Sequence, residues 1–173
     1  MAYAEGEEER VLRACQIVVD EDLARPTLIG RPAIIAQRIE KFGLRMKEEL
    51  DYDVVNVEQD HRYRDFWQTY HRLTERSGVT VQMAKIEMRR RLTLIAGMLR
   101  LKRDVDGRIC CYWGTTATHL APLDQVSVTR EGATPPTSTK ARLLPRRARH
   151  VPDTPANRYR PDDSSAAIAT INT

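Results

Sequence analysis

The chain has 173 residues, of which 30% are charged and 41% hydrophobic, and its formal net charge at pH 7 is +4. This length suits one domain, or one domain and a tail, and no apolar run is long enough for a membrane span. No basic, apolar and small-residue segment opens the chain, so no secretory signal is expected. The cysteines (Cys15, Cys110 and Cys111) match neither a disulfide framework nor a zinc spacing, which favours a reduced, cytoplasmic location.

The positive charge is confined to the C-terminal part of the chain. Residues 1–126 hold 20 basic and 20 acidic side chains, whereas residues 127–173 hold 8 basic and 4 acidic ones. Six of the nine prolines also lie in 127–173, which has neither helical nor strand periodicity. The sequence therefore predicts an ordered region, 1–126, and a tail, 127–173, that lacks regular structure between 130 and 163.

The first elements of the ordered region alternate between helix and strand. Apolar residues at steps of three and four predict a helix over Glu7–Glu21, and Pro26–Ile29 predicts a strand. A helix follows over Pro32–Lys41, with proline in its first turn, and then a strand at Val54–Val57. This order favours a parallel sheet covered by helices, that is, an α/β fold.

Two longer helices and a further strand complete the ordered region. One helix is predicted over Asp60–Arg76 and a second, with a continuous apolar face, over Thr80–Leu99. A buried strand is expected at Ile109–Trp113, and a helix begins near Thr116. Apart from one loop, treated below, this part offers no compact catalytic motif, since it lacks GxGxxG, GxxxxGK[ST], HExxH and GxSxG.

Several polar and aromatic groups in these helices have a structural and a functional interpretation. Aromatic residues among arginines resemble a base-stacking surface, but their helical spacing is more typical of a core: Tyr63, Phe66, Trp67 and Tyr70. The run Arg89–Arg91 could bind phosphate, yet consecutive helical residues point in different directions, so a solvated or salt-bridged run is expected. His61 and His71 are too far apart to share a metal, and no metal site is predicted.

The strongest candidate for a ligand site is the segment from Gly114 to His119, between a predicted strand and a predicted helix. Gly114 permits close approach of the backbone, and free helix N–H groups with the Thr115 and Thr116 hydroxyls suit a phosphate or acyl oxygen. His119 lies one turn further on. Helix capping by threonine explains the same pattern equally well.

Three stretches resemble the phosphate acetyl/butyryl-transferase family: Ala4–Arg45, RYRDFWQTYHRLTERSGVTVQMAKIEMRRR at Arg62–Arg91, and DGRICCYWGTTATHLAPLDQV at Asp106–Val126. The second is similar to the phosphotransacetylase-like C-terminal module of bacterial NADP-dependent malic enzymes. The resemblance implies a doubly wound α/β fold with helices on both faces, and a cleft for CoA and acyl phosphate between this half and a second half. It implies that Gly114, Thr115, Thr116 and His119 contact the acyl phosphate or CoA.

The sequence departs from the family pattern at three places. Its first strand is reduced to about Tyr3-Ala4, Cys111 stands where glycine is usual, and Ala121 stands where arginine is usual. A cation at 121 could meet an anionic ligand. The tail echoes the family only faintly, so the family half-domain is expected to end at Val126, and the second half is expected to be missing.

Three functional hypotheses follow. In the first, the chain is a truncated piece of a malic enzyme's regulatory module, responsive to acetyl-CoA, with no activity alone; NADP and divalent metal then belong to malic-enzyme modules that these residues lack. In the second, it is an active phosphate acetyltransferase. The third, a basic-tailed nucleic-acid binder, is disfavoured by the neutral ordered region. Exposed apolar surface is expected to produce a homo-oligomer.

Overall fold

The computed structural model describes residues 1–110, 123, 125–126, 138–144, 147–152 and 168–171. The strands of the ordered region are β1 (Ala2–Tyr3), β2 (Thr27–Ile29), β3 (Asp53–Val55) and β4 (Arg108–Ile109). Its helices are α1 (Glu9–Asp20), α2 (Pro32–Lys41), α3 (Tyr63–Thr74), the 3₁₀ turn η1 (Glu75–Ser77), α4 (Val81–Arg90) and α5 (Leu92–Leu101).

The four strands form one parallel sheet in the order β3-β2-β1-β4. The chain moves outward from β1 through α1 to β2 and through α2 to β3. It then returns through α3, α4 and α5 to β4, which lies on the other side of β1. The predicted parallel α/β fold is confirmed, and the shortened first strand is found at Ala2–Tyr3 in the centre of the sheet.

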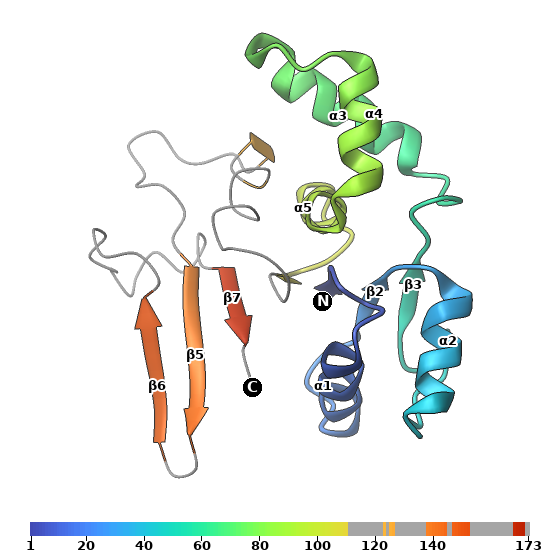
Figure 1. Ribbon diagram of the computed structural model, residues 1–173, viewed down its shortest axis with the longest axis vertical. Coiled ribbons are helices and arrows are strands. Elements are labelled where there is room, and N and C mark those ends of the chain that lie inside the picture. The colour runs from blue at the N-terminus through green and yellow to red at the C-terminus, as the bar shows by residue number, and fades with distance from the viewer. Residues whose placement is uncertain (111–122, 124, 127–137, 145–146, 153–167, 172–173) are drawn as a thin grey trace.

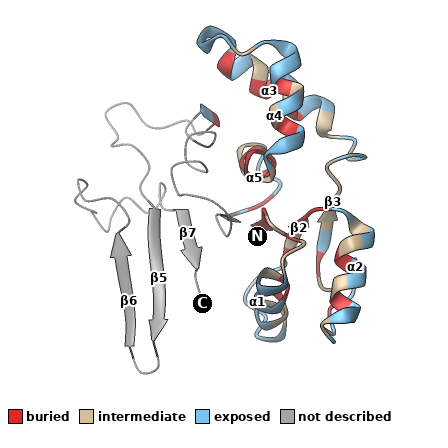
Figure 2. Ribbon diagram, in the orientation of Figure 1, coloured by how far each residue is buried: buried red, intermediate tan, exposed pale blue. Residues whose placement is uncertain are grey.

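Alternate residues of the strands enter two separate cores, because successive side chains of a strand point to opposite faces. Tyr3 and Leu28 pack with α1 and α2 around Leu12 and Ile35. Their neighbours on the other face, among them Ile29, pack with α3, α4 and α5. Figure 1 shows the two groups of helices on either side of the strands, and Figure 2 shows the buried residues along their inner faces. The sheet is therefore doubly wound, as the family resemblance implied.

The predicted helix over 80–99 is two helices. Thr80 caps α4 by accepting a hydrogen bond from the Met83 N–H at 3.2 Å. The chain becomes extended at Arg91, whose φ and ψ are −114° and 94°, and α5 then starts in a new direction. The break separates a helix with one buried face from a helix whose residues Thr93–Leu99 are all buried.

Gly97 of α5 brings a later part of the chain into the same core. A Cβ at Gly97 would lie 3.0 Å from the Leu123 side chain and 3.1 Å from that of Val126. Both residues are buried and helical, and the neighbouring Gln125 accepts a hydrogen bond from the Tyr70 hydroxyl at 2.8 Å. These residues agree with the helix expected to begin near Thr116, whose first residues lie outside the described part.

The tail contains regular structure, contrary to expectation. Strands β5 (Ser138–Leu144), β6 (Arg147–Pro152) and β7 (Ile168–Ile171) form a second sheet in the order β6-β5-β7. β5 pairs antiparallel with β6 and parallel with β7. The prolines that suggested irregular structure precede β5, stand between the strands in sequence, or end β6, where they remove no central ladder hydrogen bond.

Candidate functional site

The carboxyl ends of the parallel strands define one edge of the first sheet. The winding direction reverses between β1 and β4, so the segments that follow these strands diverge to opposite faces. In open α/β sheets, ligands bind at this switch point because backbone groups are free there. The segment from Ala4 to Glu8 follows β1 at this edge, and Cys110 follows β4.

The predicted ligand loop begins at the switch point. The Ala4 N–H donates to the Ile109 carbonyl at 3.0 Å, so the chain leaves β4 directly beside β1. Cys110 is buried there, as expected for the start of this segment. The predicted contact residues themselves, Gly114, Thr115, Thr116 and His119, lie outside the described residues, as do Cys111 and Ala121.

A carboxylate and a guanidinium form a close pair at this edge. Arg31, which follows β2, donates through its Nε and one Nη to the two oxygens of Glu7, at 2.9 and 2.8 Å. The Arg31 backbone N–H donates to the same carboxylate at 2.9 Å, and Arg38 of α2 donates to the Glu7 carbonyl. Glu7 is therefore held from three directions, and it fixes the Arg31 side chain in turn.

Two glycines allow this close approach. A Cβ at Gly6 would lie 2.9 Å from the backbone N and O of Ile29, and a Cβ at Gly30 would lie 2.9 Å from the Glu7 side chain. The Gly6 N–H donates to the Ile29 carbonyl at 3.2 Å. The loop after β1 thus lies directly against the end of β2, because neither position carries a side chain.

The electrostatics of this pair suit anion binding better than proton transfer. Hydrogen bonds from the Arg31 side chain lower the pKa of Glu7 below its ordinary value, against the opposing effect of partial burial. Glu7 therefore stays ionised at neutral pH. The Arg31 side chain is 61% exposed, and its remaining N–H groups have no partner among the described residues. They can meet a carboxylate or phosphate.

Neither member of this pair was predicted from the sequence, because the helical pattern over Glu7–Glu21 places Glu7 only in the first turn of a helix. The signal that could have revealed the pair is the run Gly30-Arg31-Pro32 directly after a strand, which places a cation at the carboxyl edge.

The thiol of Cys15 is no candidate nucleophile, because burial raises its pKa to about 12. Within the part of the chain that the structure describes, no three His, Cys, Asp or Glu residues could hold a metal ion, and no helix could cross a membrane.

The predicted aromatic stripe divides between core and surface. Phe66 and Tyr70 are buried, as expected, whereas Tyr63 and Trp67 line a groove of about 410 Å³ between α3 and α4. Arg89 also lines the groove, while Arg91, at the break after α4, pairs with Glu87 of that helix. His61 is exposed and His71 is partly buried.

A parallel sheet with helices packed on both faces places the chain in the class of doubly wound α/β proteins. Residues 1–172 match the family model described as Phosphate acetyl/butaryl transferase. The chain belongs to this family. The match continues past Val126, where the family half-domain was expected to end.

Individual relatives show which proteins of this family the chain is similar to. It is 41% identical over 130 residues to an NAD-dependent malic enzyme of Rhizobium meliloti, covering 75% of this chain and 17% of that protein. It is 35% identical over 167 residues to an NADP-dependent malic enzyme of Escherichia coli, covering 96% and 22%. A phosphotransacetylase structure from Streptococcus pyogenes has a TM-score of 0.70 at 22% identity, covering 80% of this chain and 40% of that one. The chain thus spans about a fifth of the malic enzymes that it matches.

Proposed function

We propose that the chain is part of a regulatory module that binds acetyl-CoA in a malic enzyme-like protein of the cytoplasm, with no phosphate acetyltransferase activity as a 173-residue polypeptide. The degree of similarity supports this assignment, since the two malic enzymes are 41% and 35% identical and the phosphotransacetylase structure is 22% identical. NADP and a divalent metal would act elsewhere in such a protein.

The observation that carries the proposal is the Glu7–Arg31 pair at the carboxyl edge. A carboxylate that is ionised and already bound by a guanidinium is a poor general base, whereas a fixed and exposed guanidinium is a good receptor for a phosphate. We assign Arg31 to the phosphate groups of acetyl-CoA. The loop from Gly114 to Thr116 and His119 would add backbone N–H, hydroxyl and imidazole groups at the same edge.

Acetyl-CoA titration by isothermal calorimetry tests the assignment, and the Arg31→Ala variant should bind at least about tenfold more weakly. Arg25→Ala is the matched control. Arg25 also forms a two-point pair with a carboxylate, that of Asp53 at 2.9 and 2.7 Å, but near the amino end of β3. Equal loss of affinity in both variants, or in neither, would contradict the assignment of Arg31.

The alternative function is an active phosphate acetyltransferase, which the family description favours. A coupled assay with acetyl phosphate and CoA separates the two functions. We expect no thioester formation by the 173-residue chain, because orientation of two substrates supplies much of such catalysis and the chain covers 40% of the phosphotransacetylase structure that it resembles. Turnover that disappears in Thr116→Ala would establish the alternative.

The substitution Ala121→Arg tests the predicted loop separately. If the loop after β4 contacts the anionic ligand, a restored arginine should tighten acetyl-CoA binding by about tenfold, the effect of one charged hydrogen bond. Unchanged affinity, together with NMR amide shifts that leave Gly114–Thr116 unmoved, would remove this loop from the site.

A further inference from the structure

We propose that copies of this chain associate end to end, the basic groove between α3 and α4 of one copy receiving the acidic amino edge of the next. Here the basic groove denotes Tyr63, Arg64, Trp67, Gln82, Lys85, Ile86 and Arg89, and the acidic amino edge denotes Ile17, Glu21, Asp22, Leu23, Glu48, Glu49 and Leu50. The inference is independent of the ligand at the switch point, because neither surface includes Arg31 or the loop after β4.

The cations of the basic groove are held in place by aromatic rings. The Lys85 ammonium lies 4.8 Å from the centre of the Trp67 ring, and the Arg89 guanidinium lies 5.2 Å from that of Tyr63. The Tyr63 hydroxyl donates to the Lys85 carbonyl at 2.8 Å, which fixes the two helices together. Because cations cover these ring faces, a nucleobase cannot stack on the same faces.

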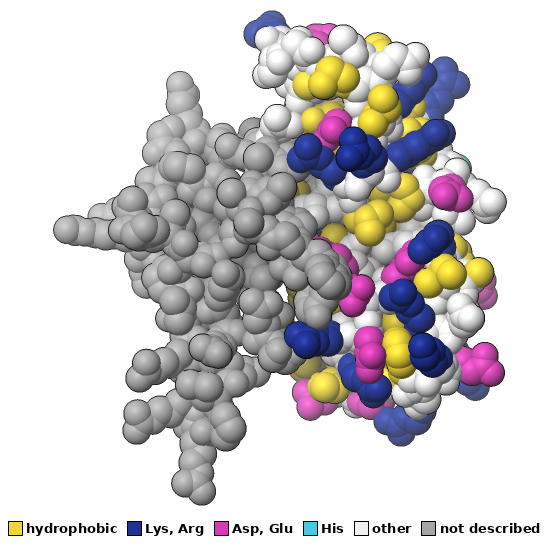
Figure 3. Space-filling model, viewed as in Figure 1, with side chains coloured by type: hydrophobic (Ala, Val, Ile, Leu, Met, Phe, Trp, Pro, Cys, Tyr) yellow, Lys and Arg dark blue, Asp and Glu magenta, His cyan; other side chains and the backbone are white. Residues whose placement is uncertain are grey.

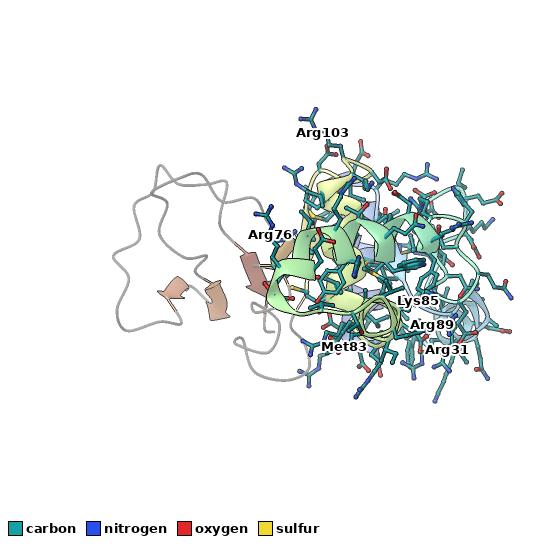
Figure 4. The ribbon with its side chains drawn as sticks, turned by 90° about the horizontal axis from the view of Figure 1, so that it is seen from above. Arg31, Arg76, Met83, Lys85, Arg89 and Arg103 are labelled. Carbon is teal, nitrogen blue, oxygen red and sulfur yellow. The ribbon has the colours of Figure 1, made fainter. Side chains whose placement is uncertain are left out.

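These positive charges are available to a partner. The described residues provide no carboxylate within ion-pairing distance of Arg64, Lys85 or Arg89. Figure 4 shows Lys85 and Arg89 on the same side of α4, and Figure 3 shows basic side chains beside hydrophobic ones over this helix pair. Lys85 and Arg89 stand one helical turn apart, so two neighbouring carboxylates could contact them together.

Exposed apolar side chains are also present on these two helices, and one of them, Ile86, lines the basic groove beside the cations. Four large hydrophobic residues of α3 and α4 are between 40% and 51% exposed: Leu73, Val81, Met83 and Ile86. A partner for this surface must therefore offer both carboxylates and exposed apolar side chains.

The acidic amino edge of the same chain has this chemistry. Its three large hydrophobic residues are 56%, 66% and 70% exposed: Ile17, Leu23 and Leu50. Its four acidic side chains are exposed, and no basic group of the described residues forms an ion pair with them: Glu21, Asp22, Glu48 and Glu49. Arg25 joins the two loops that carry these residues, because it follows Leu23 and donates to the Glu49 carbonyl at 2.8 Å.

The two surfaces cannot meet within one copy. The acidic edge precedes β2 and β3 at the amino ends of the strands, whereas α3 follows the carboxyl end of β3. Figure 1 shows α3 and α4 at the end of the molecule opposite to α1 and the end of α2. A second copy is therefore the occupant that fits both charge and apolar content. Such a head-to-tail contact leaves one surface of each kind free and allows species larger than a dimer.

Reversed charges test this pairing by sedimentation velocity on the 173-residue chain at rising concentration and low salt. The unmodified chain should form dimers and larger species that dissociate as salt increases. K85E/R89E alone and E21K/E49K alone should remain monomeric, because each makes its two surfaces alike in charge. An equimolar mixture of the two variants should associate again, since each then offers the surface that the other lacks.

R76E/R103E is the matched control, with the same change in net charge as K85E/R89E. Both arginines are exposed, and Figure 4 shows them away from Lys85 and Arg89. This variant should associate like the unmodified chain, and circular dichroism should show every variant folded. A monomeric unmodified chain, undiminished association of K85E/R89E, or a mixture that stays monomeric would each overturn the proposal.

Discussion

Gly6 is the residue at which the switch point is most sensitive to added volume. A methyl group there would meet the Ile29 backbone at 2.9 Å, and backbone atoms cannot move aside as a flexible side chain can. We expect Gly6→Ala to lower the free energy of unfolding by about 1–3 kcal/mol, the usual cost of overpacking. Urea denaturation measures this loss.

Gly43→Asn is the control for Gly6→Ala. Gly43 ends α2 with a φ of +65°, and a Cβ there would meet no atom within 4 Å. Asparagine adopts positive φ more readily than most residues, so this substitution should cost less than Gly6→Ala. An equal or larger loss at Gly43 would show that close packing at Gly6 is not the dominant constraint.

Glu7 should make the stability of the fold sensitive to acid. The pKa of Glu7 in the folded state lies below its ordinary value. The ionised carboxylate therefore stabilises the fold at every pH above the ordinary pKa of a glutamate, and this stabilisation is lost as pH falls through the folded pKa. Arg31→Gln should raise the pKa of Glu7 toward the ordinary value and make the variant less stable at neutral pH. The difference from the unmodified chain should shrink in acid.

Two measurements follow this effect of Arg31. Carbon NMR of the Glu7 carboxyl group gives its pKa directly, and urea denaturation at several pH values gives the stability difference. A carboxyl titration that is unchanged in Arg31→Gln would contradict the pair as the cause of the lowered pKa.

At the scale of the element, α4 offers a direct comparison of a buried and an exposed face. Met88 is fully buried in the core beneath α3 and α5, whereas Ile86, two residues before it, is 51% exposed. Met88→Ala should lower the free energy of unfolding by about 2–5 kcal/mol, and Ile86→Ala should change it by about 0.5 kcal/mol or less. Thermal and urea denaturation of the two variants check the difference.

The helices show what periodicity can predict and where it fails. The helix over Pro32–Lys41 was predicted with its observed ends, because proline marks its start and Gly43 follows its end. The break at Arg91 was missed, since neither glycine nor proline stands there. Its cause is tertiary: α5 is buried all round between the sheet and its neighbours, and no local pattern of α4 contains that information.

The pairing of strands in the tail could not be predicted from the sequence either. The predictive signals there are side-chain periodicity and proline content, and both describe burial or local geometry. β5 and β6 pair antiparallel from Thr139 with Pro152 to Leu144 with Arg147, and this register is a property of backbone pairing that neither signal reports. The Glu7–Arg31 pair was missed for a similar reason, since its members are 24 residues apart in sequence.

At the scale of the whole molecule, Arg62 links the segment before α3 to the segment after α5. It donates to Asp60, before α3, at 2.8 Å and to Asp104, after α5, at 3.0 Å. Burial alone would raise the pKa of Asp60, but hydrogen bonds from Arg62 outweigh it and lower that pKa. Arg62 thus holds the chain entering α3 next to the chain leaving α5.

Arg62→Ala should lower the free energy of unfolding by about 1–2 kcal/mol at neutral pH, a value reduced by the partial exposure of the three side chains. Its effect should diminish as pH falls through the folded pKa of Asp60, because a protonated Asp60 no longer needs the cation. Urea denaturation at neutral and acidic pH checks both statements. A loss that is constant across this range would assign the role of Arg62 to packing.

The central position of β1 sets the order in which a nascent chain can complete its sheet. Ala2 pairs with Thr27 on one side, but its partner on the other side, Arg108, is synthesised about a hundred residues later. At about 5–20 residues per second, several seconds separate the emergence of β3 from that of β4. During this interval one edge of β1 has no strand to pair with, and the apolar face that α5 covers in the finished fold stays open to solvent.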